Sequence, residues 1–185
     1  NLNNFTLTIA SGTTITVDSS LTYYGPKTMV INTGNIDLYG NLYINTQSAS
    51  AGGGNATITF KGSAKQRIYG TTVGWTTHLP KVTINKTGDT LLFHDIIFAG
   101  NNWTYTAGNT NAGTSLVYFN GTFNITGSMA FYDVAFVGGN SGGTFTLGTG
   151  TTMTVNRDLV FSGTTNPVTL NGTSGNIHVK RDITV

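Results

Sequence analysis

A short motif that returns along the chain most constrains how it can fold. Each copy has an apolar residue, a polar residue, an optional Arg or Gly, Asp or Asn, and then apolar-x-apolar. Four copies, residues 93–100, 131–138, 155–163 and 179–185, carry Asp95, Asp133, Asp158 and Asp182. These Asp residues are 38, 25 and 24 positions apart. Because self-similarity at a period of about 20–50 residues is typical of stacked repeats, we expect a solenoid with coils of about 24 residues.

The Asp position suits a corner between two strands, since Asp and Asn side chains bond to nearby backbone N–H groups and tolerate unusual φ angles. A fifth copy, residues 38–44, places Asn41 there. The longer 38-residue interval predicts a loop insertion at 101–113, a segment rich in turn formers. We therefore expect one domain, residues 1–185, in which Asn41 and the four Asp residues are structural corner residues.

Short segments with alternating apolar residues and Thr run along most of the chain, as in Phe5–Ile9 and Ala56–Phe60. Thr, Asn and Gly together fill 80 of the 185 positions (35, 20 and 25), and Glu is absent. Thr favours strands, whereas Asn and Gly favour turns. This pattern predicts an all-β protein, a right-handed parallel β-helix; a β-sandwich, jelly roll or barrel is the alternative, although it would not readily repeat one Asp corner.

Two further stretches carry a resemblance to known proteins. Residues 40–45, Gly-Asn-Leu-Tyr-Ile-Asn, resemble a corner that is common in secreted parallel β-helices of the filamentous-haemagglutinin-like and autotransporter-like surface proteins. Residues 59–70 and 79–88 are similar to a repeat of prokaryotic cell-surface proteins. The resemblance covers residues 33–185 and implies an extracellular location, a structural or adhesive role, and no catalytic residues in the coils.

The residues that carry enzyme chemistry are scarce. There is no Glu or Cys, and His78, His94 and His178 share no metal-binding spacing. Glycoside hydrolysis generally needs two carboxylates, and the corner position already explains four of the seven Asp residues. We therefore expect no enzyme and no catalytic, cofactor-binding or metal-binding residue; a polysaccharide lyase or hydrolase using Asp133 or Asp158 is the least favoured alternative.

Surface chemistry offers two further sets of candidates. Trp103 and Tyr105, in the predicted insertion, are the candidates for a contact surface that binds glycans, among other aromatics that include Tyr23, Tyr24, Trp75 and Tyr118. Glycosylation, which depends on a host that glycosylates Asn-x-Thr, has seven candidate sites: Asn4, Asn55, Asn85, Asn102, Asn120, Asn124 and Asn171.

The ends of the chain and its charge suggest which partners to expect. The sequence starts on Asn1 and close to its first strand, and it ends within a motif copy, so we expect a secreted chain whose signal sequence has been removed and whose terminal strands pair with other copies. No segment is apolar enough to span a membrane, and a net charge of +2 without a basic cluster argues against nucleic acid. The favoured function is an extracellular structural protein that assembles head-to-tail into a filament, sheath or layer; the main alternative is an adhesin or carbohydrate-binding module.

Overall fold

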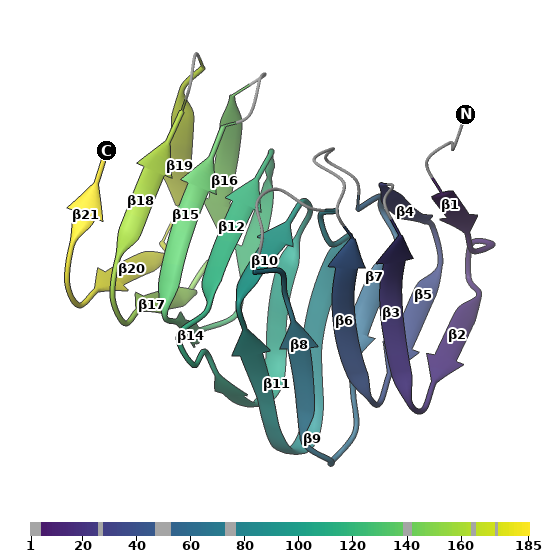
Figure 1. Ribbon diagram of the computed structural model, residues 1–185. Helices are drawn as coiled ribbons and strands as arrows, with labels where there is room; N and C mark the ends of the chain where they lie inside the picture. The colour runs from purple at the N-terminus through teal and green to yellow at the C-terminus, as the bar shows by residue number, and fades with distance from the viewer. Residues whose placement is uncertain are drawn as a thin grey trace.

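The computed structural model describes residues 5–25, 28–46, 53–72, 77–138, 142–163, 166–172 and 174–185. These residues form an all-β, parallel β-solenoid of about 7 turns (Figure 1). The predicted fold class is thereby confirmed, and the β-sandwich alternative is wrong because the paired strands of the stack run parallel. None of the described segments is a helix that could cross a membrane.

Each coil passes over three faces, because turns rich in Gly, Asn and Asp interrupt the alternating segments at similar intervals. Face 1 is the longest ladder, and Figure 1 shows its strands side by side from one end of the molecule to the other. It consists of β2 (Thr14–Val17), β5 (Asn35–Leu38), β7 (Thr57–Phe60), the first half of β9 (Lys81–His94), the start of β11 (Trp103–Asn111), β13 (Phe123–Thr126), β16 (Gly143–Leu147) and β19 (Val168–Gly172).

Face 2 follows face 1 in each coil, and the long strands β9 and β11 bend from one face onto the other. Face 2 consists of β3 (Ser20–Gly25), β6 (Asn41–Thr46), β8 (Gln66–Tyr69), the second half of β9, the end of β11, β14 (Met129–Phe131), β17 (Thr152–Val155) and β20 (Asn176–Val179). Face 3 closes the coil with β1 (Phe5–Thr8), β4 (Met29–Asn32), β10 (Ile96–Ala99), β12 (Leu116–Asn120), β15 (Asp133–Val137), β18 (Leu159–Ser162) and β21 (Ile183–Thr184).

The coils differ in length more than the motif spacing predicts. Successive coils lie about 22 residues apart, and the offset between paired residues ranges from 17 (Leu116 to Asp133) to 26 (Leu42 to Ile68). The predicted loop insertion at 101–113 is wrong, because residues 103–111 form β11, which pairs with β9 and β13. The 38-residue interval between Asp95 and Asp133 instead holds two short coils, of 20 residues (Ile96 to Leu116) and 17 residues.

Inward side chains fill the solenoid, and outward ones are mostly Thr and Asn on face 1. Thr59, Thr83, Thr104 and Thr126 form one outward row in register across four neighbouring strands. The core holds a cluster of fully buried aromatic rings that contact one another edge-on or tilted: Phe93, Trp103, Phe119, Phe131, Phe136 and Phe145. Rings in such contacts stabilise a core beyond the area they bury, so this cluster fixes the stacking of the central coils.

Buried polar side chains at the corner between faces 1 and 2 also link neighbouring coils. The Lys86 ammonium donates to Gln66 Oε1 and to the Ala64 carbonyl, each at 2.7 Å, and Gln66 Nε2 donates to the Leu38 and Gly40 carbonyls at 2.8 Å. Burial lowers the pKa of Lys86, while the nearby Asp89 carboxylate raises it. Since buried donors and acceptors are costly to leave unpaired, these bonds hold the corners of three successive coils in place.

Candidate functional site

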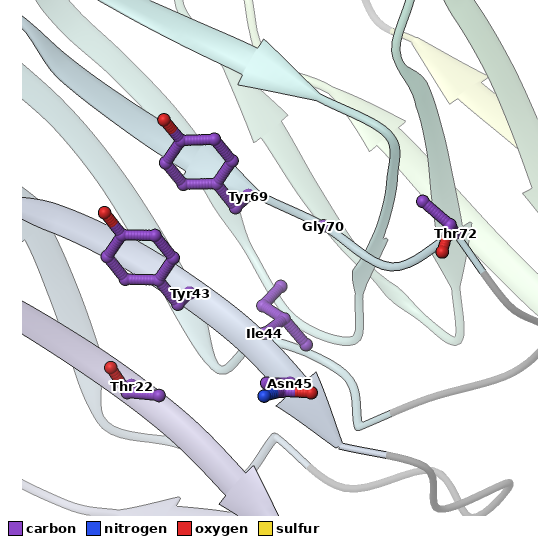
Figure 2. Close-up of a pocket in the computed structure, with 7 residues that line it drawn as sticks. All are labelled: Thr22, Tyr43, Ile44, Asn45, Tyr69, Gly70 and Thr72. Atoms are coloured by element: carbon purple, nitrogen blue, oxygen red, sulfur yellow. The ribbon is translucent and has the colours of Figure 1, made fainter.

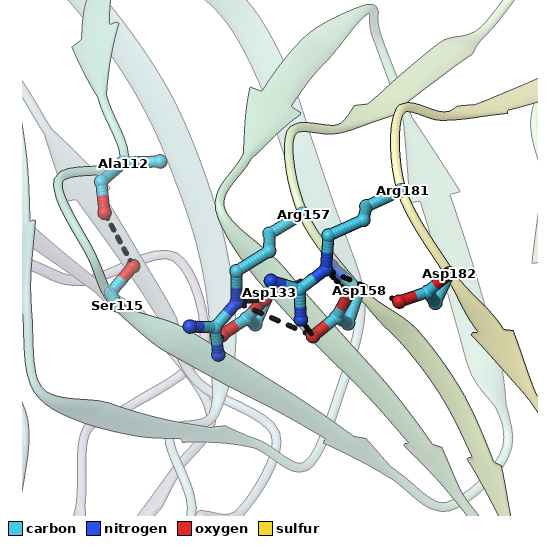
Figure 3. A network of polar contacts seen from close by, with 7 residues as sticks. All are labelled: Ala112, Ser115, Asp133, Arg157, Asp158, Arg181 and Asp182. Atoms are coloured by element: carbon cyan, nitrogen blue, oxygen red, sulfur yellow. Dashed lines mark hydrogen bonds and ion pairs between the residues drawn. The ribbon is translucent and has the colours of Figure 1, made fainter.

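Asp133, Arg157, Asp158, Arg181 and Asp182 form an ion-pair ladder along the corner between faces 2 and 3 (Figure 3). Arg157 Nε donates to Asp133 Oδ1 of the preceding coil at 2.8 Å, and its Nη2 pairs with Asp133 Oδ2. Arg181 binds Asp158 in the same two-pronged way, with an Nε–Oδ1 distance of 2.6 Å. Each arginine therefore joins its own coil to the one before it.

The earlier part of this corner is built differently. Asp95 lies there with a left-handed φ of 62°, the conformation for which Asp is suited. The coil between Asp95 and Asp133 carries Ser115, whose hydroxyl donates to the Ala112 carbonyl at 2.7 Å (Figure 3). The motif did not reveal Ser115, because its coil lacks both Asp and the expected spacing.

Asn41 lies at a different corner from the four Asp residues, so its alignment with them is wrong. Leu42 pairs with Ile68 and Ile68 with Phe93, which places Asn41 at the start of the face 2 strand and Asp95 at its end. Asn41 Oδ1 accepts a hydrogen bond from the Arg67 backbone N–H at 2.9 Å. The preceding Gly40 is required, because a Cβ there would lie 1.0 Å from the Ser19 carbonyl oxygen.

The predicted contact surface at Trp103 and Tyr105 is wrong for Trp103 and is not formed by Tyr105 alone. Trp103 is fully buried, its indole N–H donates to the Met129 sulfur at 3.2 Å, and its ring contacts other core rings edge-on. Tyr105 is half-buried, and its hydroxyl donates to the Gly108 carbonyl of its own strand. Of the other predicted aromatics, Tyr23 is buried, Tyr24 is exposed, and Trp75 lies outside the described residues.

The two end coils expose apolar residues that are buried in every comparable position of the stack. Ile15 in β2 is 38% exposed, whereas its register partner Ile36 is 1% exposed. Leu170 in β19 is 39% exposed, whereas its partner Phe145 is fully buried. Ile183 in β21 is 60% exposed, against 2% for its partner Leu159. These residues point inward and lack only a further coil to cover them.

An apolar hollow of about 300 Å³ also lies close to the C-terminal end coil. Phe161, Pro167, Val168 and Val185 contribute most of its apolar lining. Together with the unpaired edges of β19, β20 and β21, this hollow makes the end coil a surface that another coil would cover.

A second concave feature lies on the outer surface of face 2, away from the ladder. It is a groove of about 370 Å³ lined by Thr22, Tyr43, Ile44, Asn45, Tyr69, Gly70 and Thr72 (Figure 2). The rings of Tyr43 and Tyr69 are almost parallel, with centroids 4.8 Å apart and an interplanar angle of 6°. His94 continues the stack beyond Tyr69, at 5.0 Å and 15°. The sequence analysis missed this groove, because Tyr43 and Tyr69 are 26 positions apart.

The sequon asparagines lie along the outer surface of the coils. Asn55, Asn85, Asn124 and Asn171 are exposed, Asn102 and Asn120 are half-buried, and Asn4 lies outside the described residues. Two of them also hold coils together, since Asn55 Oδ1 accepts from the Thr33 N–H at 2.7 Å and Asn102 Oδ1 accepts from the Asn124 N–H at 2.9 Å. Modification of these sites remains a prediction.

Within the part of the chain that the structure describes, no three His, Asp, Glu or Cys side chains gather at a potential metal site. No protein-family model matches the chain, and neither a curated protein nor a solved structure matches it. The geometry of the end coils, the ladder and the groove therefore carries the functional argument.

Proposed function

We propose that this protein is an extracellular structural protein whose solenoids stack head-to-tail into a filament, sheath or layer at the cell surface. The observation that carries the proposal is the uncovered state of both end coils: Ile15 at one end and Leu170 and Ile183 at the other are core residues without a covering coil. Burying apolar surface contributes about 25 cal/mol per Å², so covering these residues favours stacking.

The geometry of the strands supports this direction of assembly. The strands pair in parallel throughout the described ladders, so the last coil of one copy and the first coil of the next can pair without reversing direction. A head-to-tail contact joins two different surfaces and leaves both free ends available, and such a contact gives an open filament when it does not close into a ring. Thr and Asn, which dominate the outward rows, leave the sides of that filament polar and uncharged.

The ion-pair ladder supports a structural role rather than a catalytic one for the Asp corner. Asp133 and Asp158, the residues that the least favoured alternative would use, are both held by arginines of the following coils. A carboxylate that acts on a glycosidic bond must instead approach the substrate. The location outside the cell is supported by the resemblance to surface proteins and by four exposed sequon asparagines.

The assembly is tested by measuring the mass of the purified protein by sedimentation velocity over a rising concentration series, with negative-stain electron microscopy of the same samples. We expect linear assemblies of the wild-type protein at high concentration. Wild-type protein that stays monomeric at millimolar concentration would overturn the proposal.

Two charge substitutions sharpen the test by blocking one end each. Ile15→Asp blocks the first coil and Leu170→Asp blocks the last, because each places a charge in the buried contact. Each variant alone is expected to stay monomeric, and an equimolar mixture is expected to stop at dimers, since each variant retains one intact end. Tyr39→Asp, at a residue that is 40% exposed on a side corner between β5 and β6, is the matched control and is expected to assemble normally.

A further inference from the structure

The face 2 groove combines a flat aromatic wall with small polar side chains. Figure 2 shows the rings of Tyr43 and Tyr69 side by side, with their faces turned the same way and with Thr22 and Asn45 beside Tyr43. Parallel rings in contact lie about 3.5–4.0 Å apart, so a centroid distance of 4.8 Å means that the rings are offset. Each ring therefore covers only part of its neighbour and leaves the rest of the face available.

The aromatic stack ends within this groove. Thr22 is the register partner of Tyr43 in the preceding coil, so a short side chain occupies the position where the next ring would lie. Asn41 Nδ2 donates to the Tyr43 hydroxyl at 3.2 Å and helps to hold the ring in its position. The last ring of the stack thus has one face without a ring neighbour, beside a space of about 370 Å³.

The remaining groove residues define the chemistry of what can bind. Thr22, Asn45 and Thr72 supply hydroxyl and amide groups, and none of the seven lining residues carries a charge. Arg67 lies on the same outward side of β8 as Tyr69, two positions before it, but it is not among the lining residues. An uncharged groove offers nothing to phosphate or carboxylate groups, which bind where arginines, lysines or helix N-termini are available.

We propose that this groove binds a neutral pyranose unit of a polysaccharide. The C–H groups on one side of the sugar ring would pack against Tyr43 and Tyr69, and its hydroxyl groups would exchange hydrogen bonds with Thr22, Asn45 and Thr72. A flat ring with polar groups around its edge fits an aromatic wall that has donors and acceptors along one side. This inference differs from the proposed assembly, because the groove uses neither Ile15 nor Leu170.

The test uses the full 185-residue chain carrying Leu170→Asp, so that assembly cannot create or hide sites. Binding of cellohexaose, maltohexaose, mannohexaose and chitohexaose is measured by titration calorimetry and by saturation-transfer NMR. We expect at least one of these neutral oligosaccharides to bind, and we expect Tyr43→Ala to weaken that binding at least tenfold. Absence of binding by all four sugars, or equal binding by the Tyr43→Ala variant, would overturn the inference.

Two further variants separate a loss of binding from a loss of folding. Thr22→Tyr adds a ring in register with Tyr43 and fills the groove, and cross-strand aromatic pairs stabilise sheets. We expect this variant to lose binding at least tenfold while its melting temperature stays the same or rises. Tyr118→Ala removes a ring that stacks on Phe98 at 4.9 Å and 8° on face 3, and as the matched control it is expected to bind normally.

Discussion

Among single residues, His78 links the stability of the solenoid to pH. Its side chain is almost fully buried, and its ring stacks on Phe98 with centroids 5.6 Å apart. Burial disfavours the charged imidazolium and lowers the pKa of His78 to about 4. In the unfolded chain the same side chain is solvated and titrates near its ordinary value of about 6.5.

The folded protein should therefore lose stability as the pH falls. Between the two pKa values the unfolded chain binds a proton that the folded chain does not, so acid favours unfolding. The contribution is fully present above about pH 6.5, declines below that value, and reaches its full loss below about pH 4. We expect about 2 kcal/mol of this loss between pH 7 and pH 5, measured by urea unfolding at each pH.

Two histidine variants test whether His78 is the cause. His78→Gln cannot titrate, so its free energy of unfolding should vary less between pH 7 and pH 5 than that of the wild type. His178→Gln changes an exposed histidine and should follow the wild type. If the His78→Gln variant shows the wild-type pH slope, another group causes the loss.

At the level of elements, the ion-pair ladder joins β15, β18 and β21 through the residues at their N-terminal ends. The members are not equivalent, because Asp133 is 6% exposed and accepts three bonds, two from Arg157 and one from the Asp158 N–H. Asp182 belongs to the last coil, its side chain is largely exposed, and it contacts only Arg181 of its own coil among the described residues. Burial and the number of partners thus decrease toward the end of the ladder.

Removing the carboxylate charge should therefore matter most at Asp133. Asp133→Asn leaves a buried site with weakened bonds, which we expect to cost about 2 kcal/mol and to lower the melting temperature by roughly 4–8 °C. Asp182→Asn should have little effect, because exposed ion pairs contribute about 0–1 kcal/mol. Equal shifts for the two variants in thermal unfolding followed by circular dichroism would contradict this account.

The strands could be predicted from the sequence more reliably than the corners. Alternation of Thr with apolar residues specifies which side chains point inward, and this holds along face 1 without knowledge of the neighbours. A turn followed by an alternating strand occurs at all three corners of every coil, however, so a motif of seven or eight residues could not distinguish the corner of Asn41 from that of Asp95.

Pairing with neighbouring coils explains the other errors. Residues 101–113 have the composition of a loop, yet pairing with β9 and β13 satisfies the backbone of Trp103 and Thr104 and holds the segment in the stack. The groove depends on register in the same way, because only the offset of 26 residues brings Tyr69 beside Tyr43. The sequence contains no local signal for either.

For the whole molecule, stability should vary along the axis, since each coil contacts mainly the coils before and after it. Central strands such as β9 and β11 have neighbours on both sides, whereas β2 and β19 each have one. Local unfolding should therefore start at the ends and spread inward.

Hydrogen exchange followed by mass spectrometry measures this gradient. We expect the slowest exchange in β9 and β11 and the fastest in β1, β2, β20 and β21. In samples that have assembled, the end strands should become protected, because a second copy pairs with them. Uniform exchange along the monomer, or end strands that stay unprotected in assemblies, would contradict the expected arrangement.

The parallel register has a consequence for the dimensions of the molecule. Each coil adds one strand spacing, about 4.8 Å, to the length of the solenoid and leaves its cross-section unchanged. Duplicating or deleting one complete coil, about 22 residues, would therefore lengthen or shorten the molecule by that same step. The chain acts as a molecular ruler, and the number of coils that a gene encodes sets the distance the protein can span.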